Sequence, residues 1–473
     1  MFHLAAATTG SAMDSDDTAA ASISSILVAN NEKNQTTGTV DARFLTQSTS
    51  FSLELPPTTI SRRRKAWNFL KKKLLFRRNR NNESGSATNA AITTLGFDYD
   101  YDIIDLPVGT DVPASTKTTG IMLIHPIGVG IGRWYYQRLV SSLVARHAKI
   151  GERLVVVVPD LLGSGSACNA TAGTKKFPLF NISDWTDQLE ALMSTVEIAT
   201  TTDGDGGSKI DNWCVIANGG CSPIALQLAQ RKKLVERTDV SEAPVSNLIL
   251  SSVPRLPFFL KNETTNDPAK IAKSYRTLSG VPGNLFWWYS CRNDGAFIQT
   301  FSEKNLIADP KNLGPNWRSN CCETALSFDG KGKYATFSFL AGTLQDGCLP
   351  SLETIKDTPL KIDIIKGVDV RRNRAKSWFW QKPKKEDKKN TRDTDHVKPE
   401  VEQASGATAA MPSSDTDTSN VDDPANKNYE TFRDYAEKNG NGGRELVIGG
   451  RISLAHEDPE GYADAILQFL FGP

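Results

Sequence analysis

The sequence predicts an α/β fold with a mostly parallel central sheet, flanked by helices and carrying a mainly helical insertion. Short continuous apolar runs alternate with stretches of helical period, which is typical of parallel strands buried on both faces. The alternation stops over residues 255–355, where aromatic residues are frequent, and resumes afterwards. With 473 residues, the chain is long enough for one large domain with additions.

The expected elements follow one another in regular order. The apolar runs that predict strands are 121–125, 153–159, 213–217, 247–251, 360–367 and 444–450. The stretches that predict helices are 134–148, 183–196, 223–236 and 458–471. We therefore divide the core into 93–254, 356–380 (a strand and the loop after it) and 444–473, with 255–355 as a helical cap above the sheet.

Two further segments lack sustained periodicity, and we expect both to be disordered. Residues 1–92 are rich in Ala, Ser, Thr and Asn, and residues 381–443 are a charged and polar low-complexity insertion. Within the first, 62–80 carries ten basic and no acidic side chains. Trp67, Leu70 and Leu74 have helical spacing there, so this segment could lie on an anionic membrane surface, or be a basic signal or a solvated tail.

Composition limits the partners and the compartment. Removing the ten charges of 62–80 from the net charge of +1 leaves −9 on the remainder, so we expect no nucleic-acid partner. The seven cysteines form no C-x-x-C pair, which favours free thiols in an intracellular, reducing compartment. No metal or cofactor motif is present, and the sequence leaves the oligomeric state open.

Four segments resemble the α/β-hydrolase superfamily. They are IHPIGVGIGRWYYQRL (124–139), PDLLGSGSA (159–167), VIANGGCSPIALQLA (215–229) and HEDPEGYADAILQFL (456–470). They are similar in turn to the oxyanion segment, the P-D-x-x-G-x-G-x-S turn, the nucleophile elbow with its helix, and the last helix. The resemblance implies an α/β-hydrolase fold with a helical cap.

A narrower resemblance is to an uncharacterised subgroup of this superfamily from cyanobacteria and plants, and it implies a chloroplast location. The stretches HPIGVG, GNLFWWYSCR and KYATFSFLAG carry this likeness.

The position that corresponds to the nucleophile is Gly219. The elbow of the superfamily is a small-x-nucleophile-x-small turn between strand and helix, and the N–H of the following residue helps to hold the oxyanion. The ungapped frame here is Ala217-Asn218-Gly219-Gly220-Cys221. Glycine has no side chain that can attack a substrate, and it tolerates the positive φ of such a turn. Cys221 is the alternative nucleophile, in a helix register shifted by two residues.

The base and the acid also depart from the pattern of the superfamily. Counting back from Glu457 places the catalytic histidine at Ile452, and the nearest histidine is His456, which is either a helix-entry residue or a displaced base. Asp369 lies one residue before the expected acid. His147, on a helix with Arg146 and Lys149, is expected to face solvent.

Other residues complete the candidate site. His125, Ile127, Gly128 and Gly220 are the expected oxyanion or pocket residues, and Phe286, Trp287 and Trp288 line either a ligand pocket or the interior of the cap. The leading hypothesis is a non-catalytic member that binds an apolar ligand or a protein partner. The alternatives are an atypical ester hydrolase using Cys221, His456 and Asp369, and a membrane interaction protein that uses 62–80.

Overall fold

The computed structural model describes most of the two expected core regions and the cap between them. The described residues are 42–55, 93–108, 117–147, 151–170, 177–202, 209–232, 243–253, 267–292, 295–345, 358–368, 437 and 442–472. Asp369, the basic segment 62–80 and nearly all of 381–443 lie outside them.

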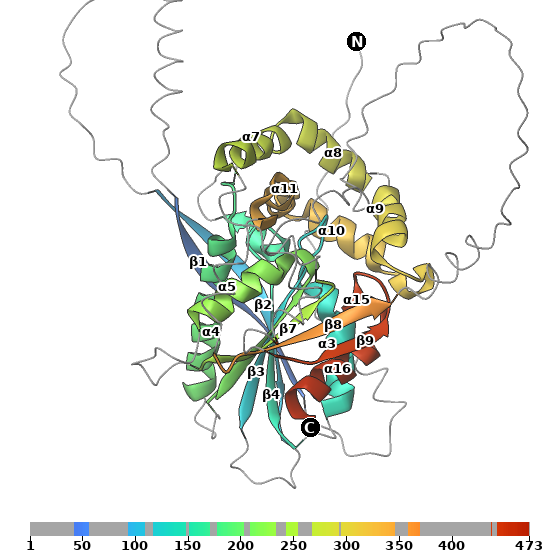
Figure 1. Ribbon diagram of the computed structural model, residues 1–473. Helices are drawn as coiled ribbons and strands as arrows, with labels where there is room; N and C mark the ends of the chain where they lie inside the picture. Colours follow the sequence, from blue (N-terminus) through green and yellow to red (C-terminus); the bar gives the residue numbers. More distant parts are fainter. Residues whose placement is uncertain are drawn as a thin grey trace, which may run out of the picture.

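One mixed sheet forms the centre of the molecule (Figure 1). Its strands are β1 (Arg43–Leu55), β2 (Thr93–Leu106), β3 (Thr118–Ile124), β4 (Arg153–Pro159), β5 (Asn169–Ala170), β6 (Asn212–Asn218), β7 (Val245–Ser251), β8 (Lys361–Val368) and β9 (Glu445–Gly449). The order is β1-β2-β4-β3-β6-β7-β8-β9, and β5 pairs with β2. β2 runs antiparallel to β1 and β4, whereas β4, β3 and β6 to β9 run parallel to one another. This is the mostly parallel sheet that the sequence predicts, and its order is that of the α/β-hydrolase fold.

Helices cover both faces of the sheet and one of its ends. The α-helices are α3 (Gln137–His147), α4 (Ile182–Thr202), α5 (Ser222–Arg231), α7 (Pro268–Leu278), α8 (Val281–Arg292), α9 (Ala296–Phe301), α10 (Trp317–Gly330), α11 (Lys333–Ala341), α15 (Leu454–Glu457) and α16 (Pro459–Phe471). Short 3-10 or π turns are η1 (Arg133–Tyr136), η2 (Gly165–Cys168), η3 (Gly219–Cys221), η6 (Ser302–Leu306), η7 (Pro310–Leu313) and η8 (Thr343–Gln345).

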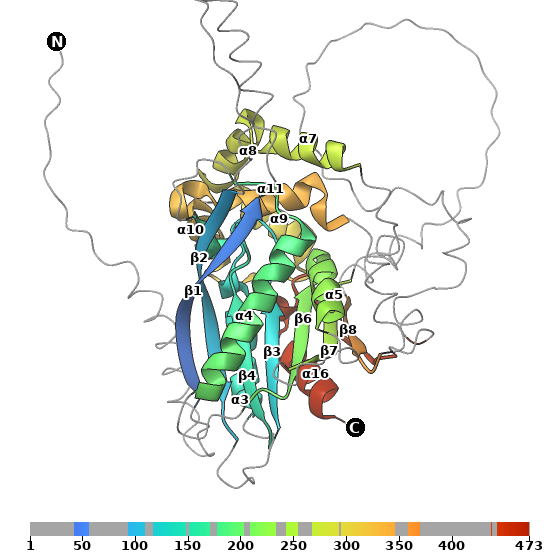
Figure 2. The ribbon, with the colours of Figure 1, turned by 90° about the vertical axis from the view of Figure 1, so that its left-hand side faces the viewer.

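The arrangement has three layers with a cap above them. α4 packs with α5 and α3 packs with α16, on opposite faces of the sheet (Figures 1 and 2). β3, β4 and β6 are buried almost along their whole length, as expected for strands covered on both faces. α7 to α11 gather at one end of the sheet, within the range assigned to the cap. Among the described residues, no helix combines the length and the apolar character needed to cross a membrane.

The expectation of disorder over 1–92 is wrong for residues 43–55. They form β1, which pairs with β2 along its whole length. Side chains add to this pairing, since Thr46 Oγ1 donates to Asp102 at 2.9 Å and Ser48 Oγ donates to Asp100 at 2.6 Å. β1 is an edge strand, paired through its backbone with one neighbour, and such a strand can form with few apolar side chains. Its many Ser and Thr residues gave no apolar run from which the strand could be predicted.

Candidate functional site

The turn after β6 is the elbow expected from the sequence. β6 ends at Asn218, η3 covers Gly219–Cys221, and α5 begins at Ser222. Gly219 has φ of +53°, a backbone conformation that is unfavourable for residues with a side chain. A Cβ at Gly219 would lie 3.8 Å from the carbonyl oxygen of Ser252, the one non-neighbouring described atom within 4 Å. The apex therefore leaves space where a side chain would stand.

Ile452, the position expected for the base, lies beside this apex. Its carbonyl oxygen accepts a hydrogen bond from Asn218 Nδ2 at 3.1 Å and another from Ser252 Oγ at 2.8 Å. These bonds join the ends of β6 and β7 to the loop after β9. Ser252 itself has φ of +51°, which is strained for a residue other than glycine. The structure thus brings Gly219, Ser252 and Ile452 together at the carboxyl edge of the sheet.

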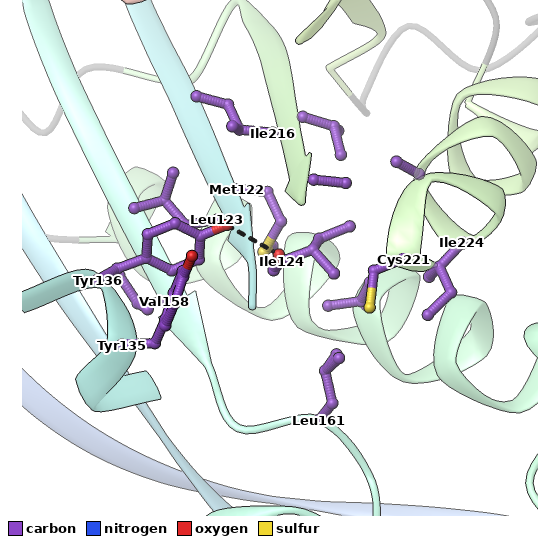
Figure 3. Packing of buried hydrophobic residues seen from close by; sticks show 14 of the residues in the cluster. Met122, Leu123, Ile124, Tyr135, Tyr136, Val158, Leu161, Ile216, Cys221 and Ile224 are labelled. Carbon is purple, nitrogen blue, oxygen red and sulfur yellow. Dashed lines mark hydrogen bonds between the residues drawn. The ribbon is translucent and has the colours of Figure 1, made fainter. Parts of the chain in front are cut away.

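Cys221 points away from this space and into the core. The thiol is buried against His125, Ile124, Ile224 and Leu161 (Figure 3). Its sulfur lies 3.4 Å from the His125 carbonyl oxygen, to which it donates. Burial raises the pKa of the Cys221 thiol to about 12, although the Ile127 N–H opposes that rise. Cys221 is therefore held as a neutral thiol that ties the elbow to the loop after β3.

His125 is also a structural residue. Its Nε2 accepts the N–H of Leu161 at 3.1 Å, so its proton is on Nδ1, which donates to the Pro126 carbonyl at 3.0 Å. Burial lowers the pKa of this imidazole, against the opposing effect of Asp160. The ring is therefore a neutral link between the end of β3 and the loop after β4.

The cap covers the remaining oxyanion residues. Thr336 Oγ1, on α11, donates to the Gly128 carbonyl at 2.9 Å. A Cβ at Gly220 would lie 2.9 Å from the ring of Phe339, so the aromatic side chain of α11 rests directly on the elbow.

His456 does not meet Cys221. Its Nε2 lies 2.6 Å from the Leu313 carbonyl oxygen, to which it donates, and within the described residues its buried Nδ1 has no hydrogen-bond partner. The ring contacts Trp317 with centroids 4.6 Å apart. Burial lowers the pKa of His456 to about 4, and Arg138 acts in the same direction. No hydrogen bond joins His456 to Cys221 in the described part of the chain, so this pair of the alternative constellation is not assembled.

Two further expectations need correction. His147 is buried rather than solvent-facing, because its Nε2 bonds to the Glu152 carbonyl at 2.6 Å. For the aromatic run on α8, the cap interior is confirmed for Trp287 but is wrong for Phe286 and Trp288. Trp287 is inside the cap with its Nε1 donating to the Ala325 carbonyl, whereas Phe286 and Trp288 lie on the outer surface.

Sequence reasoning missed a charged network below the elbow. Asp160, in the turn after β4, is bound by Arg133 at 2.7 Å, by the N–H of Arg133 at 2.8 Å and by the hydroxyl of Ser166 at 2.8 Å. Burial alone would raise the pKa of Asp160, but Arg133 and these donors hold it below its usual value. The carboxylate fixes the turn geometry. The segment PDLLGSGSA (159–167), which resembles the superfamily, contains Asp160 and Ser166 and could have indicated this network.

No group of three or more His, Cys, Asp or Glu residues in the described part of the chain is placed to hold a metal ion. The six described cysteines are free.

Comparison with known proteins gives likenesses of fold only. No family model matches the chain, and no curated protein matches it. Among solved structures, the peroxisomal α/β-hydrolase Lpx1 from Saccharomyces cerevisiae is 13% identical, with 90% of this chain and 88% of that chain covered and a TM-score of 0.48. A putative α/β hydrolase from Nostoc is 12% identical, covering 79% and 95%, with a TM-score of 0.44. An evolved variant of potato epoxide hydrolase is 14% identical, covering 79% and 96%, also at 0.44.

The strand order and the sharp turn between β6 and α5 therefore identify this chain as a protein of the α/β-hydrolase fold.

Proposed function

We propose that this chain is a non-catalytic member of the α/β-hydrolase fold that binds an apolar ligand at the carboxyl edge of the sheet, below the cap. The observation that carries the proposal is Gly219, which stands at the apex of the elbow with φ of +53°. Hydrolysis through this fold needs a nucleophilic side chain at that point, and glycine supplies none.

The residues beside the apex support the same interpretation. A base must reach the nucleophile within a hydrogen bond, and the position expected for it holds Ile452. Ile452 contacts the elbow through its carbonyl oxygen, which accepts from Asn218 and Ser252. Its aliphatic side chain is 40% exposed and cannot take up a proton.

The alternative ester hydrolase based on Cys221 is disfavoured by its surroundings. With a pKa of about 12, roughly one thiol in a hundred thousand is ionised at neutral pH, and the thiolate is the reactive form. His456 Nε2 is hydrogen-bonded to the Leu313 carbonyl and does not contact Cys221. With a pKa of about 4, His456 is too weak a base to accept a proton near neutral pH.

The chemistry of the apex indicates the kind of ligand. The space above Gly219 is bounded by the Ser252 carbonyl oxygen, which is a hydrogen-bond acceptor, and the neighbouring Gly220 is covered by the ring of Phe339. A mainly apolar molecule with one hydrogen-bond donor would complement these groups.

Filling the space tests the proposal. The fluorescent probe 8-anilinonaphthalene-1-sulfonate would be titrated into the wild-type chain and into Gly219→Leu and Gly219→Ala. Both variants carry the same backbone strain, but only leucine fills the space. We expect Gly219→Leu to weaken probe binding by about tenfold, equivalent to the burial of roughly one apolar side chain, and Gly219→Ala to change it by less than about threefold. If the two variants bind the probe with equal affinity, the probe does not occupy the space above Gly219, and the proposal is contradicted.

A further inference from the structure

The outer face of α8 is unusually apolar. Val281, Leu285, Trp288 and Tyr289 follow one another at helical spacing and are 72%, 60%, 51% and 58% exposed. The sequence from Val281 to Cys291 contains no charged residue. A helix on the surface of a soluble domain normally turns charged and polar residues outward, so this face departs from the expected pattern.

The helix is fixed with this face outward. Trp287 is 3% exposed, its Nε1 donates to the Ala325 carbonyl at 3.1 Å, and its ring meets Phe337 with centroids 5.8 Å apart. Gly283 and Cys291 lie on the same inner side and are buried. The exposure of the other side is therefore a consequence of how α8 packs.

The apolar surface continues onto α9. The ring of Phe286 contacts that of Phe297 at 5.8 Å between centroids, and Phe297 stacks on Phe301 at 6.2 Å. Phe286 and Phe297 remain 37% and 39% exposed. We call the exposed set Val281, Leu285, Phe286, Trp288, Tyr289 and Phe297 the cap patch. Exposed apolar patches of several large side chains are characteristic of interaction surfaces.

The helix next to the cap patch carries basic residues. Lys270, Lys273 and Arg276 are exposed on α7, which precedes α8 and lies beside it at the tip of the molecule, above α11 (Figures 1 and 2). α7 contains no acidic residue. Asp267, its N-cap, accepts the N–H of Ala269 at 2.9 Å. The tip therefore combines an apolar, aromatic surface with a cationic edge.

We propose that the cap patch docks on the surface of an anionic phospholipid bilayer. Tryptophan and tyrosine favour the interface of a membrane, where their rings contact acyl chains and their polar groups meet water. The aliphatic side chains of α8 would enter the boundary region, and the cations of α7 would meet lipid phosphates. A second copy docked through the same surface would add a second set of cations at the edge, which favours a lipid partner over self-association.

Vesicle partitioning with the full chain tests this proposal. Binding would be measured by co-sedimentation with vesicles of phosphatidylcholine, with and without phosphatidylserine. The cap variant carries Leu285→Ser, Trp288→Ser and Tyr289→Ser. The matched control carries Leu45→Ser, Ile198→Ser and Val447→Ser, which replace three exposed apolar residues on β1, α4 and β9.

We expect the cap variant to lower the partition coefficient by at least about tenfold and the control to change it by less than about twofold, since only the cap variant removes inserted apolar area. Replacing Lys270, Lys273 and Arg276 by glutamate should remove most of the gain from phosphatidylserine. Equal loss in the cap variant and the control would overturn the proposal.

The basic segment 62–80 requires a separate readout, because it could attract anionic vesicles by itself. In a background with Trp67, Trp378 and Trp380 replaced by phenylalanine, brominated lipid should quench tryptophan fluorescence, and the further change Trp288→Phe should abolish most of that quenching. Quenching that persists without Trp288 would overturn the proposal. So would a wild-type dimer that dissociates in the cap variant while vesicle binding is unchanged, because the cap patch would then join two copies of the chain.

Discussion

The turn after β4 and the turn after β6 lie on neighbouring parts of one sheet edge, yet their side chains have opposite character. In the first, Asp160 is buried, and its carboxylate accepts from the side chain and the N–H of Arg133 and from the N–H of Ser166. In the second, Gly219 offers no side chain, and the space it leaves meets only a carbonyl oxygen within 4 Å among the described residues. The first turn is thus built around a bound carboxylate, whereas the second presents no side chain at its apex.

Glu457 and His456 extend the comparison to the last helix. Glu457 accepts the N–H groups of Ala308 and Asp309 through one oxygen and that of Arg451 through the other, at 2.7 to 2.9 Å. His456 binds Leu313 in the same region. Both residues fasten the segment after α9 to the core. Glu457 and His456 therefore hold two loops to the core, and we expect their replacement to lower the free energy of unfolding more than a change at the elbow does.

The largest expected effect is that of Asp160→Asn. The variant removes the buried carboxylate charge that Arg133 and two N–H groups share, while Arg133 keeps Asp100 and Asp102 as partners. It should lower the free energy of unfolding by about 3–4 kcal/mol, the lower part of the range for broken buried pairs. Urea denaturation checks this value. Asp464→Asn, which breaks the exposed pair with Arg146, is the matched control and should cost less than about 1 kcal/mol. Similar costs for the two variants would show that the turn does not depend on its carboxylate.

A smaller effect is expected from His456, and it depends on pH. In the unfolded chain histidine takes up a proton as pH falls through about 6.5, whereas folded His456 stays neutral down to about 4. The free energy of unfolding should therefore be highest above this window. It should fall by up to about 3 kcal/mol as pH drops through the window, and no further below it.

His456→Gln keeps a donor for Leu313 and should flatten this dependence. His125 and His147, whose pKa values are also lowered by burial, contribute to the slope that remains. Thermal unfolding between pH 4 and 7 distinguishes the outcomes, and an unchanged slope in the variant would refute the assignment.

The smallest effect should come from the elbow. Gly219→Ala places a Cβ in open space but on a backbone with positive φ, so a loss of about 1–3 kcal/mol is expected from strain alone. Gly449→Ala, in β9, also has room for a Cβ and lacks positive φ, and it should be close to neutral. Equal melting temperatures for Gly219→Ala and the wild type would mean that the turn relaxes without difficulty.

The sequence predicted the parts of the fold that follow a simple period. Strands buried on both faces appear as continuous apolar runs, and this holds for β3, β4, β6 and β7. β2 was harder because it alternates, with Phe97, Tyr99 and Tyr101 buried and the intervening aspartates less so. A search for period two would have found it.

Residues whose environment depends on distant partners were not predictable from local sequence. His147 sits among basic residues, but its buried position depends on a bond to the Glu152 carbonyl. The aromatic run of α8 is different, because helical period alone sends Trp287 inward and its neighbours outward. At the elbow, the small residues at fixed spacing predicted that Gly219 lies at the apex. The inward direction of Cys221 required the packed structure, because its thiol donates to the carbonyl of His125, 96 residues away in the sequence.

The most direct test of the account is steady-state hydrolysis of an activated ester, p-nitrophenyl acetate, by the wild-type chain, Cys221→Ala and His456→Gln at neutral pH. If Gly219 leaves the elbow without a nucleophile, all three proteins should release p-nitrophenol at the same rate, that of spontaneous hydrolysis. Sustained turnover by the wild type that disappears in Cys221→Ala would contradict the account and assign the reaction to the buried thiol.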